Sequence, residues 1–182
     1  MYNLVNITNY FRGQSPNIKR GGYNEGFNFK GYDERILFYP HLLNKTYYPE
    51  NYRNWFHVKT LILEEGHPLF EAFGGIHHVY ANEKAYKALL NNEKVFPEGS
   101  VFVFDLLEVV KENNSVAEGK RKVLAYMKKH GKKLFAETGN WEFAAFAEGD
   151  PSKQIVKDAK RECFSCHASQ KEKDYIFSGW GK

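Results

Sequence analysis

Alternation of apolar and polar residues predicts a series of short strands along the middle and end of the chain. We expect strands over residues 55–63, 76–81, 100–110, 123–127 and 141–147. The strand over 100–110 is apolar on both faces at its start, which favours a central place with cover on both sides. In the strand over 55–63, one side is expected to carry Phe56, Val58, Thr60 and Ile62.

Two helices are predicted between and after these strands. Asn82 is a suitable N-cap for a helix over residues 83–90, whose apolar residues recur at four-residue spacing. Asp150 and Pro151 predict the start of a second helix that runs to about Cys163. Because the strands come first and there is no regular strand–helix alternation, we predict an α+β fold, with an antiparallel sheet of about five strands and flanking helices.

Composition supports one globular domain. The chain has 182 residues, of which 42% are hydrophobic, and we expect a single domain over residues 51–182. Residues 1–50 have little periodicity and predict a loop-rich N-terminal arm. Aromatic residues reach 16%, which suits a β-rich core and also a pocket for a large flat ligand. The net charge of +4 comes with no broad basic stripe, so no nucleic-acid partner is expected.

The chemistry of the chain centres on its two cysteines, Cys163 and Cys166. They lie in Cys163-Phe164-Ser165-Cys166-His167, a C-x-x-C-H motif that is typical of covalent haem attachment. Two thiols about one helical turn apart can form thioethers with the two vinyl groups of a porphyrin, and the following histidine can bind the iron. We therefore expect one haem c, with His167 as the metal ligand and both cysteines as attachment residues.

Other interpretations of the same residues remain open at this point. A thioredoxin-like C-x-x-C normally begins a helix after a strand, whereas this pair closes a predicted helix. A zinc site would need a further, distant ligand beside Cys163, Cys166 and His167. Besides Met1, Met127 is the only methionine. A methionine in a strand more commonly packs in the core than serves as the sixth iron ligand. We therefore expect a five-coordinate iron with an open sixth position.

Haem attachment also predicts where the protein functions. The first residues show no basic start followed by an apolar run, so they predict no signal peptide. Thioether attachment in bacteria takes place outside the cytoplasm, and we therefore expect a periplasmic protein whose signal peptide is absent from this sequence.

With its C-terminal haem motif, the sequence resembles the cytochrome P-460 / cytochrome c′-beta family over about residues 52–177. Besides the haem motif, the family-like blocks are Tyr52-Arg53-x-Trp55, Ile76-His77-His78-Val79-Tyr80-Ala81-Asn82, Ala85-Tyr86, Phe96-Pro97-Glu98-Gly99-Ser100-Val101 and Asp174-Tyr175-Ile176-Phe177. The resemblance implies a five-stranded antiparallel sheet, haem packed on one sheet face, His167 as proximal ligand and a homodimer.

The resemblance also bears on activity. Family enzymes of the P-460 type cross-link a lysine to the porphyrin and oxidise hydroxylamine, and that lysine aligns at about Phe104 of this chain. Residues 100–107 contain no lysine, so the chain is closer to the cytochrome c′-beta branch, which binds nitric oxide and carbon monoxide under an apolar cap. The distal candidates are Phe104, Phe102, His78, His77, Tyr80 and Asp105.

Three functions follow as hypotheses. The first is a gas-binding cytochrome for NO or CO. The second is a haem oxidoreductase acting on hydroxylamine or nitric oxide, which needs a proton-relay group such as His77, His78 or Asp105. The third is a plain electron-transfer cytochrome with a redox partner protein. Whether the protein is an enzyme is left open by the sequence.

Overall fold

The computed structural model describes residues 46–131 and 134–177. The chain divides into two units, residues 1–47 and residues 48–182. Almost all of the predicted N-terminal arm, residues 1–50, therefore lies outside the described residues.

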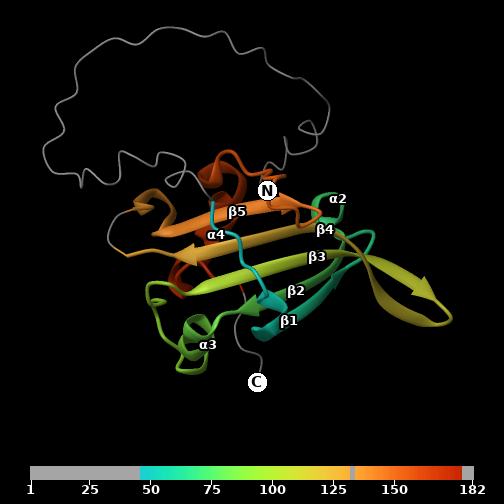
Figure 1. Ribbon diagram of the computed structural model, residues 1–182, viewed down its shortest axis with the longest axis horizontal. Coiled ribbons are helices and arrows are strands. Elements are labelled where there is room, and N and C mark those ends of the chain that lie inside the picture. Colours follow the sequence, from blue (N-terminus) through green and yellow to red (C-terminus); the bar gives the residue numbers. More distant parts are fainter. Residues whose placement is uncertain (1–45, 132–133, 178–182) are drawn as a thin grey trace, which may run out of the picture. The chain divides into compact units, whose positions relative to one another are not determined.

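A single five-stranded antiparallel sheet forms the framework (Figure 1). Neighbouring strands follow one another in chain order, so that β3 is central. The α+β prediction is confirmed. The strands are β1 Phe56–Leu63, β2 Gly75–Ala81, β3 Val101–Glu112, β4 Ser115–Lys129 and β5 Trp141–Ala147.

Short helices flank the sheet, and in the described part of the chain none is long and apolar enough to cross a membrane. Helix α3 forms as predicted, because the side chain of Asn82 accepts a hydrogen bond from the backbone N–H of Ala85 at 3.0 Å. The helical segments are η2 Tyr52–Asn54, α2 Phe70–Phe73, α3 Glu83–Leu90, η3 Ala136–Thr138, η4 Lys160–Phe164, α4 Ser165–His167 and η5 Ala168–Lys173.

The two faces of the sheet have different cover. Side chains of directly paired residues on neighbouring strands lie on the same face. The face on which α3 packs is called the helix face, and it carries the paired row Ala81, Phe102, Met127 and Phe143. The opposite face carries another paired row, which contains Thr60, His78, Asp105, Leu124 and Phe146.

The hairpin of β3 and β4 is longer than predicted. β4 begins at Ser115 rather than at Val123, and it pairs with β3 out to the Glu112–Ser115 pair. Asn113 and Asn114 form the turn, both with positive φ. The added part projects beyond the sheet as a two-stranded ribbon (Figure 1). Because most of its residues are exposed on both faces, its sequence shows no apolar alternation that could have predicted it.

The predicted helix over residues 150–163 is wrong for most of its length. Asp150 instead closes a turn, in which its carboxylate accepts hydrogen bonds from the N–H and hydroxyl of Ser152. The following residues run along the free edge of β5, where Ile155 N donates to Ala145 O at 2.9 Å. Backbone hydrogen bonds to this edge replace the expected helical hydrogen bonds. Regular helical structure begins only near η4.

Strand β1 has an irregular register that changes its predicted faces. Its pairing with β2 shifts between His57 and Lys59. Phe56 consequently pairs with Ala81 on the helix face, whereas Thr60 and Ile62 lie on the opposite face. The prediction that Phe56, Thr60 and Ile62 share one side is therefore wrong.

Candidate functional site

The C-x-x-C-H residues occupy one continuous helical segment near the end of the described chain. The first part, η4, is a wide π-helical turn, a form that is frequent at functional sites. Cys163 lies in this turn and is partly buried, whereas Cys166 lies in α4 and is exposed. Neither cysteine forms a disulfide, so both thiols are free for another covalent partner.

The imidazole of His167 is held by a hydrogen bond and by two aromatic rings. Its Nδ1 lies 2.7 Å from the backbone carbonyl oxygen of Tyr175, which can only accept, so Nδ1 carries the proton. The centres of the Phe143 and Phe177 rings each lie 5.0 Å from the imidazole centre. Burial lowers the pKa of His167, which favours the neutral ring. Nε2 therefore keeps its lone pair for a metal, the arrangement usual for ligating histidines.

The environment of Cys163 does not suit thiolate chemistry. Burial raises the pKa of its thiol to about 12, with a smaller contribution from the nearby Glu162. A thioredoxin-like or zinc-binding cysteine is normally a thiolate with a lowered pKa. Across residues 46–131 and 134–177, no group of three or more His, Cys, Asp and Glu residues is arranged to hold a metal ion.

The helix face offers apolar side chains beside His167, whose imidazole contacts Phe143 of this face. In the middle of β2, β3 and β4, Val79, Phe104 and Ala125 pair directly on this face, yet all three are only half-buried. Central strand positions of this type are usually fully covered. The next strand contributes Ala145 in the same row, so the half of the row on β4 and β5 carries only methyl side chains. These residues fit a planar macrocycle such as haem.

Phe104 is fixed in this surface by two neighbours. The His77 imidazole lies edge-on to its ring at 4.9 Å between centres, and the Phe73 ring lies at 6.3 Å. His77 is buried, and its Nε2 is hydrogen-bonded to the backbone carbonyl of Phe73. Burial lowers the pKa of His77 and so favours a neutral ring. The N–H of this ring is thus committed to Phe73.

Two other candidates on the helix face belong to the core under α3. Phe102 is 4% exposed and packs against Phe96, with ring centres 5.3 Å apart. Met127 is 7% exposed and belongs to the same buried cluster. Both side chains pack in the protein interior. For Met127 this is the core role, rather than that of sixth iron ligand.

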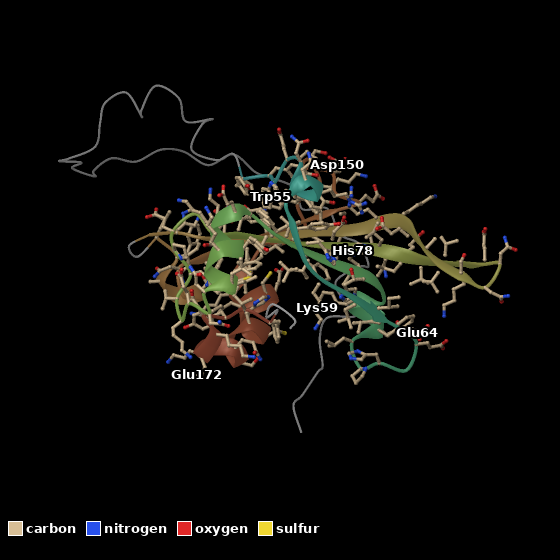
Figure 2. The ribbon with its side chains drawn as sticks, turned by 90° about the horizontal axis from the view of Figure 1, so that it is seen from below. Trp55, Lys59, Glu64, His78, Asp150 and Glu172 are labelled. Carbon is tan, nitrogen blue, oxygen red and sulfur yellow. The ribbon has the colours of Figure 1, made fainter. Side chains whose placement is uncertain are left out.

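The remaining candidates, His78, Tyr80 and Asp105, lie on the opposite face, so the sheet separates them from His167. His78 contacts Thr60 Oγ1 through Nδ1 and Glu118 Oε1 through Nε2, each at 2.8 Å. His78 can be followed in Figure 2, where Lys59 is labelled on the neighbouring strand β1. His77 and Phe104 therefore lie on the sheet face where Phe143 contacts His167, whereas His78, Tyr80 and Asp105 lie on the other face.

Asp105 is the centre of a charged cluster on the opposite face. It is fully buried and accepts hydrogen bonds from Arg121 Nε at 2.7 Å, Tyr52 Oη at 2.5 Å and Arg53 at 2.9 Å. Burial alone would raise the pKa of Asp105, but the hydrogen bonds from Arg121, Tyr52 and Arg53 outweigh it and lower the pKa below its ordinary value. Asp105 is a structural carboxylate in this arrangement.

One residue of the helix face was missed by sequence reasoning. Lys59 pairs with Val79, which in turn pairs with Phe104, so the register places Lys59 on the same face. Simple alternation from Phe56 puts Lys59 on the other side, and only the register shift after His57 reverses this. The side chain is exposed.

The chain matches the sequence model of a known protein family. The sequence model of the cytochrome P-460 family matches residues 49–178, which is most of the chain. No curated protein matches the chain.

Proposed function

We propose that this chain, which belongs to the cytochrome P-460 family and is a haem-binding cytochrome, carries one haem c and binds small gases such as NO or CO. Cys163 and Cys166 form the two thioethers, and His167 is the only protein ligand of a five-coordinate iron. We place the protein in the periplasm. The observation that carries the proposal is the fixed His167 imidazole, with its Nδ1 bonded to Tyr175 and its Nε2 free, one residue after Cys166.

Cys163 and Cys166 would hold the haem, each through one thioether to a vinyl group. Once attached, haem supplies an iron with one open coordination position for a diatomic ligand.

The apolar helix face determines which ligand is favoured there. Phe104 presents a hydrocarbon ring, and the N–H of its neighbour His77 is already used by the Phe73 carbonyl. A bound O₂, which carries partial negative charge, therefore receives no hydrogen bond from either residue. Leaving such a group unpaired costs about 1–3 kcal/mol. The less polar NO and CO avoid most of this cost.

Lys59 gives specific support to a second function, a haem oxidoreductase for hydroxylamine or nitric oxide. Its side chain is the one ammonium that the register places in the row of Val79 and Phe104. An ammonium can deliver a proton to a reacting nitrogen or oxygen atom. Turnover of hydroxylamine with an electron acceptor, lost in Lys59→Met and kept in Lys111→Met, would favour this function. Lys111 lies on the projecting hairpin and pairs with Glu64.

Two partners are also proposed. Among the strands of the described residues, β1 lies at the edge of the sheet and pairs with β2 alone, and Phe56, Leu61 and Ile62 on it are each at least 40% exposed. These features support a homodimer, which analytical ultracentrifugation of the haem-loaded protein tests.

The exposed Cys166 supports access of a redox partner to the haem edge.

Ligand titration tests the gas-binding function. We expect the ferrous protein to bind NO and CO with clear optical changes and to bind O₂ weakly. Phe104→Ala should raise O₂ binding by opening the surface to water, whereas Phe102→Leu, a change within the core, should not. Ferrous protein that fails to bind NO or CO would refute the proposal. Hydroxylamine turnover in the same preparation would replace it with the enzyme function.

A further inference from the structure

A buried ion pair joins the end of β4 to the segment that follows the haem motif. Lys129 Nζ lies 2.7 Å and 2.8 Å from the two carboxylate oxygens of Asp174. The residues are 6% and 7% exposed, respectively. Lys129 Nζ also donates to the Gly139 carbonyl at 3.0 Å and lies 4.9 Å from the centre of the Trp141 ring. Charged side chains are rarely buried to this degree, and a buried pair is poor evidence of stabilisation by itself.

Asp174 is also tied to two further segments. Its Oδ2 accepts a hydrogen bond from the backbone N–H of Phe96 at 2.9 Å. Its own carbonyl accepts one from Trp141 Nε1 at 3.0 Å. The loop before β3, the end of β4 and the start of β5 therefore all hold this one residue.

The backbone at this point has an uncommon conformation. Asp174 and Tyr175 have φ of 50° and 69°, in the left-handed region that non-glycine residues seldom adopt. The Tyr175 ring lies against Gly139, where an added Cβ would stand 2.2 Å from the ring, and it also packs on Phe164. Such a conformation persists only where the surroundings enforce it. This conformation directs the Tyr175 carbonyl oxygen toward His167, and the oxygen accepts a hydrogen bond from Nδ1–H of the imidazole.

We propose that the Lys129–Asp174 ion pair positions His167 as the iron ligand. Asp174 is a positioning residue, because it fixes the turn whose next carbonyl holds the imidazole. This inference rests on the proposed function, in which His167 ligates the iron. A hydrogen bond on the outer nitrogen sets the tautomer and ring orientation of a ligating histidine and increases its basicity. The ion pair thereby strengthens the bond from His167 to iron and favours the ferric state.

Resonance Raman spectroscopy of the ferrous haem-loaded protein tests this proposal through the iron–histidine stretching band. In Asp174→Asn, Lys129 loses its counter-charge and the turn loosens. We expect the band to move to lower frequency and to broaden, and the reduction potential to rise. A general loss of stability would not produce this pair of changes.

The matched control is Asp105→Asn. Asp105 is likewise a buried carboxylate paired with a cation, but it lies on the opposite face of the sheet. This variant should lose stability while the band and the potential keep their wild-type values. The double variant Lys129→Met with Asp174→Asn leaves no unpaired buried charge and should show the shifted band even if Asp174→Asn alone accumulates poorly.

The outcomes separate the two proposals. An iron–histidine band in the wild type that stays unchanged in the double variant would overturn the positioning role and leave the proposed function intact. A wild-type protein with no such band would overturn the proposed five-coordinate iron with His167 as its ligand, and the positioning role with it. A shift in both Asp174 variants, absent from Asp105→Asn, would support the positioning role.

Discussion

Replacing Asp105 with asparagine should destabilise the protein and leave its haem chemistry unchanged. The substitution keeps the shape of the side chain but removes the buried negative charge between Arg53 and Arg121. Removing one partner of a buried ion pair costs about 3–5 kcal/mol. The side chains of Arg53 and Arg121 are 42% and 29% exposed, so water can solvate them in part. We therefore expect the lower end of that range, about 3 kcal/mol.

The loss can be measured in two ways. For a protein of this size each kcal/mol shifts Tm by about 2–4 °C, so Tm should fall by roughly 6–12 °C at pH 7. The pKa of Asp105 is lowered in the folded state, so its stabilising contribution is present above the unfolded pKa of about 3.9. That contribution is lost as the pH falls through the folded pKa. The difference in unfolding free energy between wild type and variant should therefore shrink in acid.

Urea denaturation at several pH values, followed by circular dichroism, gives this difference directly. Glu64→Gln is the matched control, because it removes a carboxylate from an exposed pair with Lys111 and should leave the urea midpoint unchanged. The haem optical spectrum and CO affinity of Asp105→Asn should equal those of the wild type. Altered CO affinity with unchanged stability would refute the placement of Asp105 away from the haem.

Further predictions concern the cap of α3, the attachment residues and the β1 register. Asn82→Ala removes the acceptor for Ala85 N and Val101 N and the donor to Gly99 O, and should lower the unfolding free energy by about 2 kcal/mol, the upper end for a helix cap. Thermal denaturation measures the loss, with Asn91→Ala at the other end of α3 as a control. When both Cys163 and Cys166 are changed to alanine, mass spectrometry of the denatured chain should show the mass of the protein without haem. A denatured double variant that still carries the mass of haem would contradict thioether attachment. An amine-reactive label on Lys59 should perturb the haem spectrum more than a label on Lys111; equal effects would argue against the register that places Lys59 on the helix face.

The sequence predicted those elements whose residues carry a complete local signal. The helix over 83–90 has both a capping side chain and an apolar stripe, and the strand over 141–147 has a dense apolar run. The outer part of β4 has neither, because a ribbon exposed on both faces needs no apolar alternation. Residues 150–159 have a start signal for a helix, but the free edge of β5 offers backbone partners that no local pattern reveals.

The candidate site was predictable in its chemistry and less so in its geometry. The C-x-x-C-H motif alone predicts the roles of Cys163, Cys166 and His167, and these roles stay predictions. Strict alternation along β3 already separates Asp105 from Phe104, so this distinction was available from the sequence. The place of Lys59 was not, because it depends on a register shift. The contact between His167 and Tyr175 depends on a left-handed turn that only the folded chain shows.

The coordination of the iron is the most direct test of the central claim, and electron paramagnetic resonance of the oxidised protein at neutral pH measures it. With His167 as the only protein ligand, the account predicts a high-spin ferric signal. A low-spin signal from two strong protein ligands would contradict it and favour electron transfer instead.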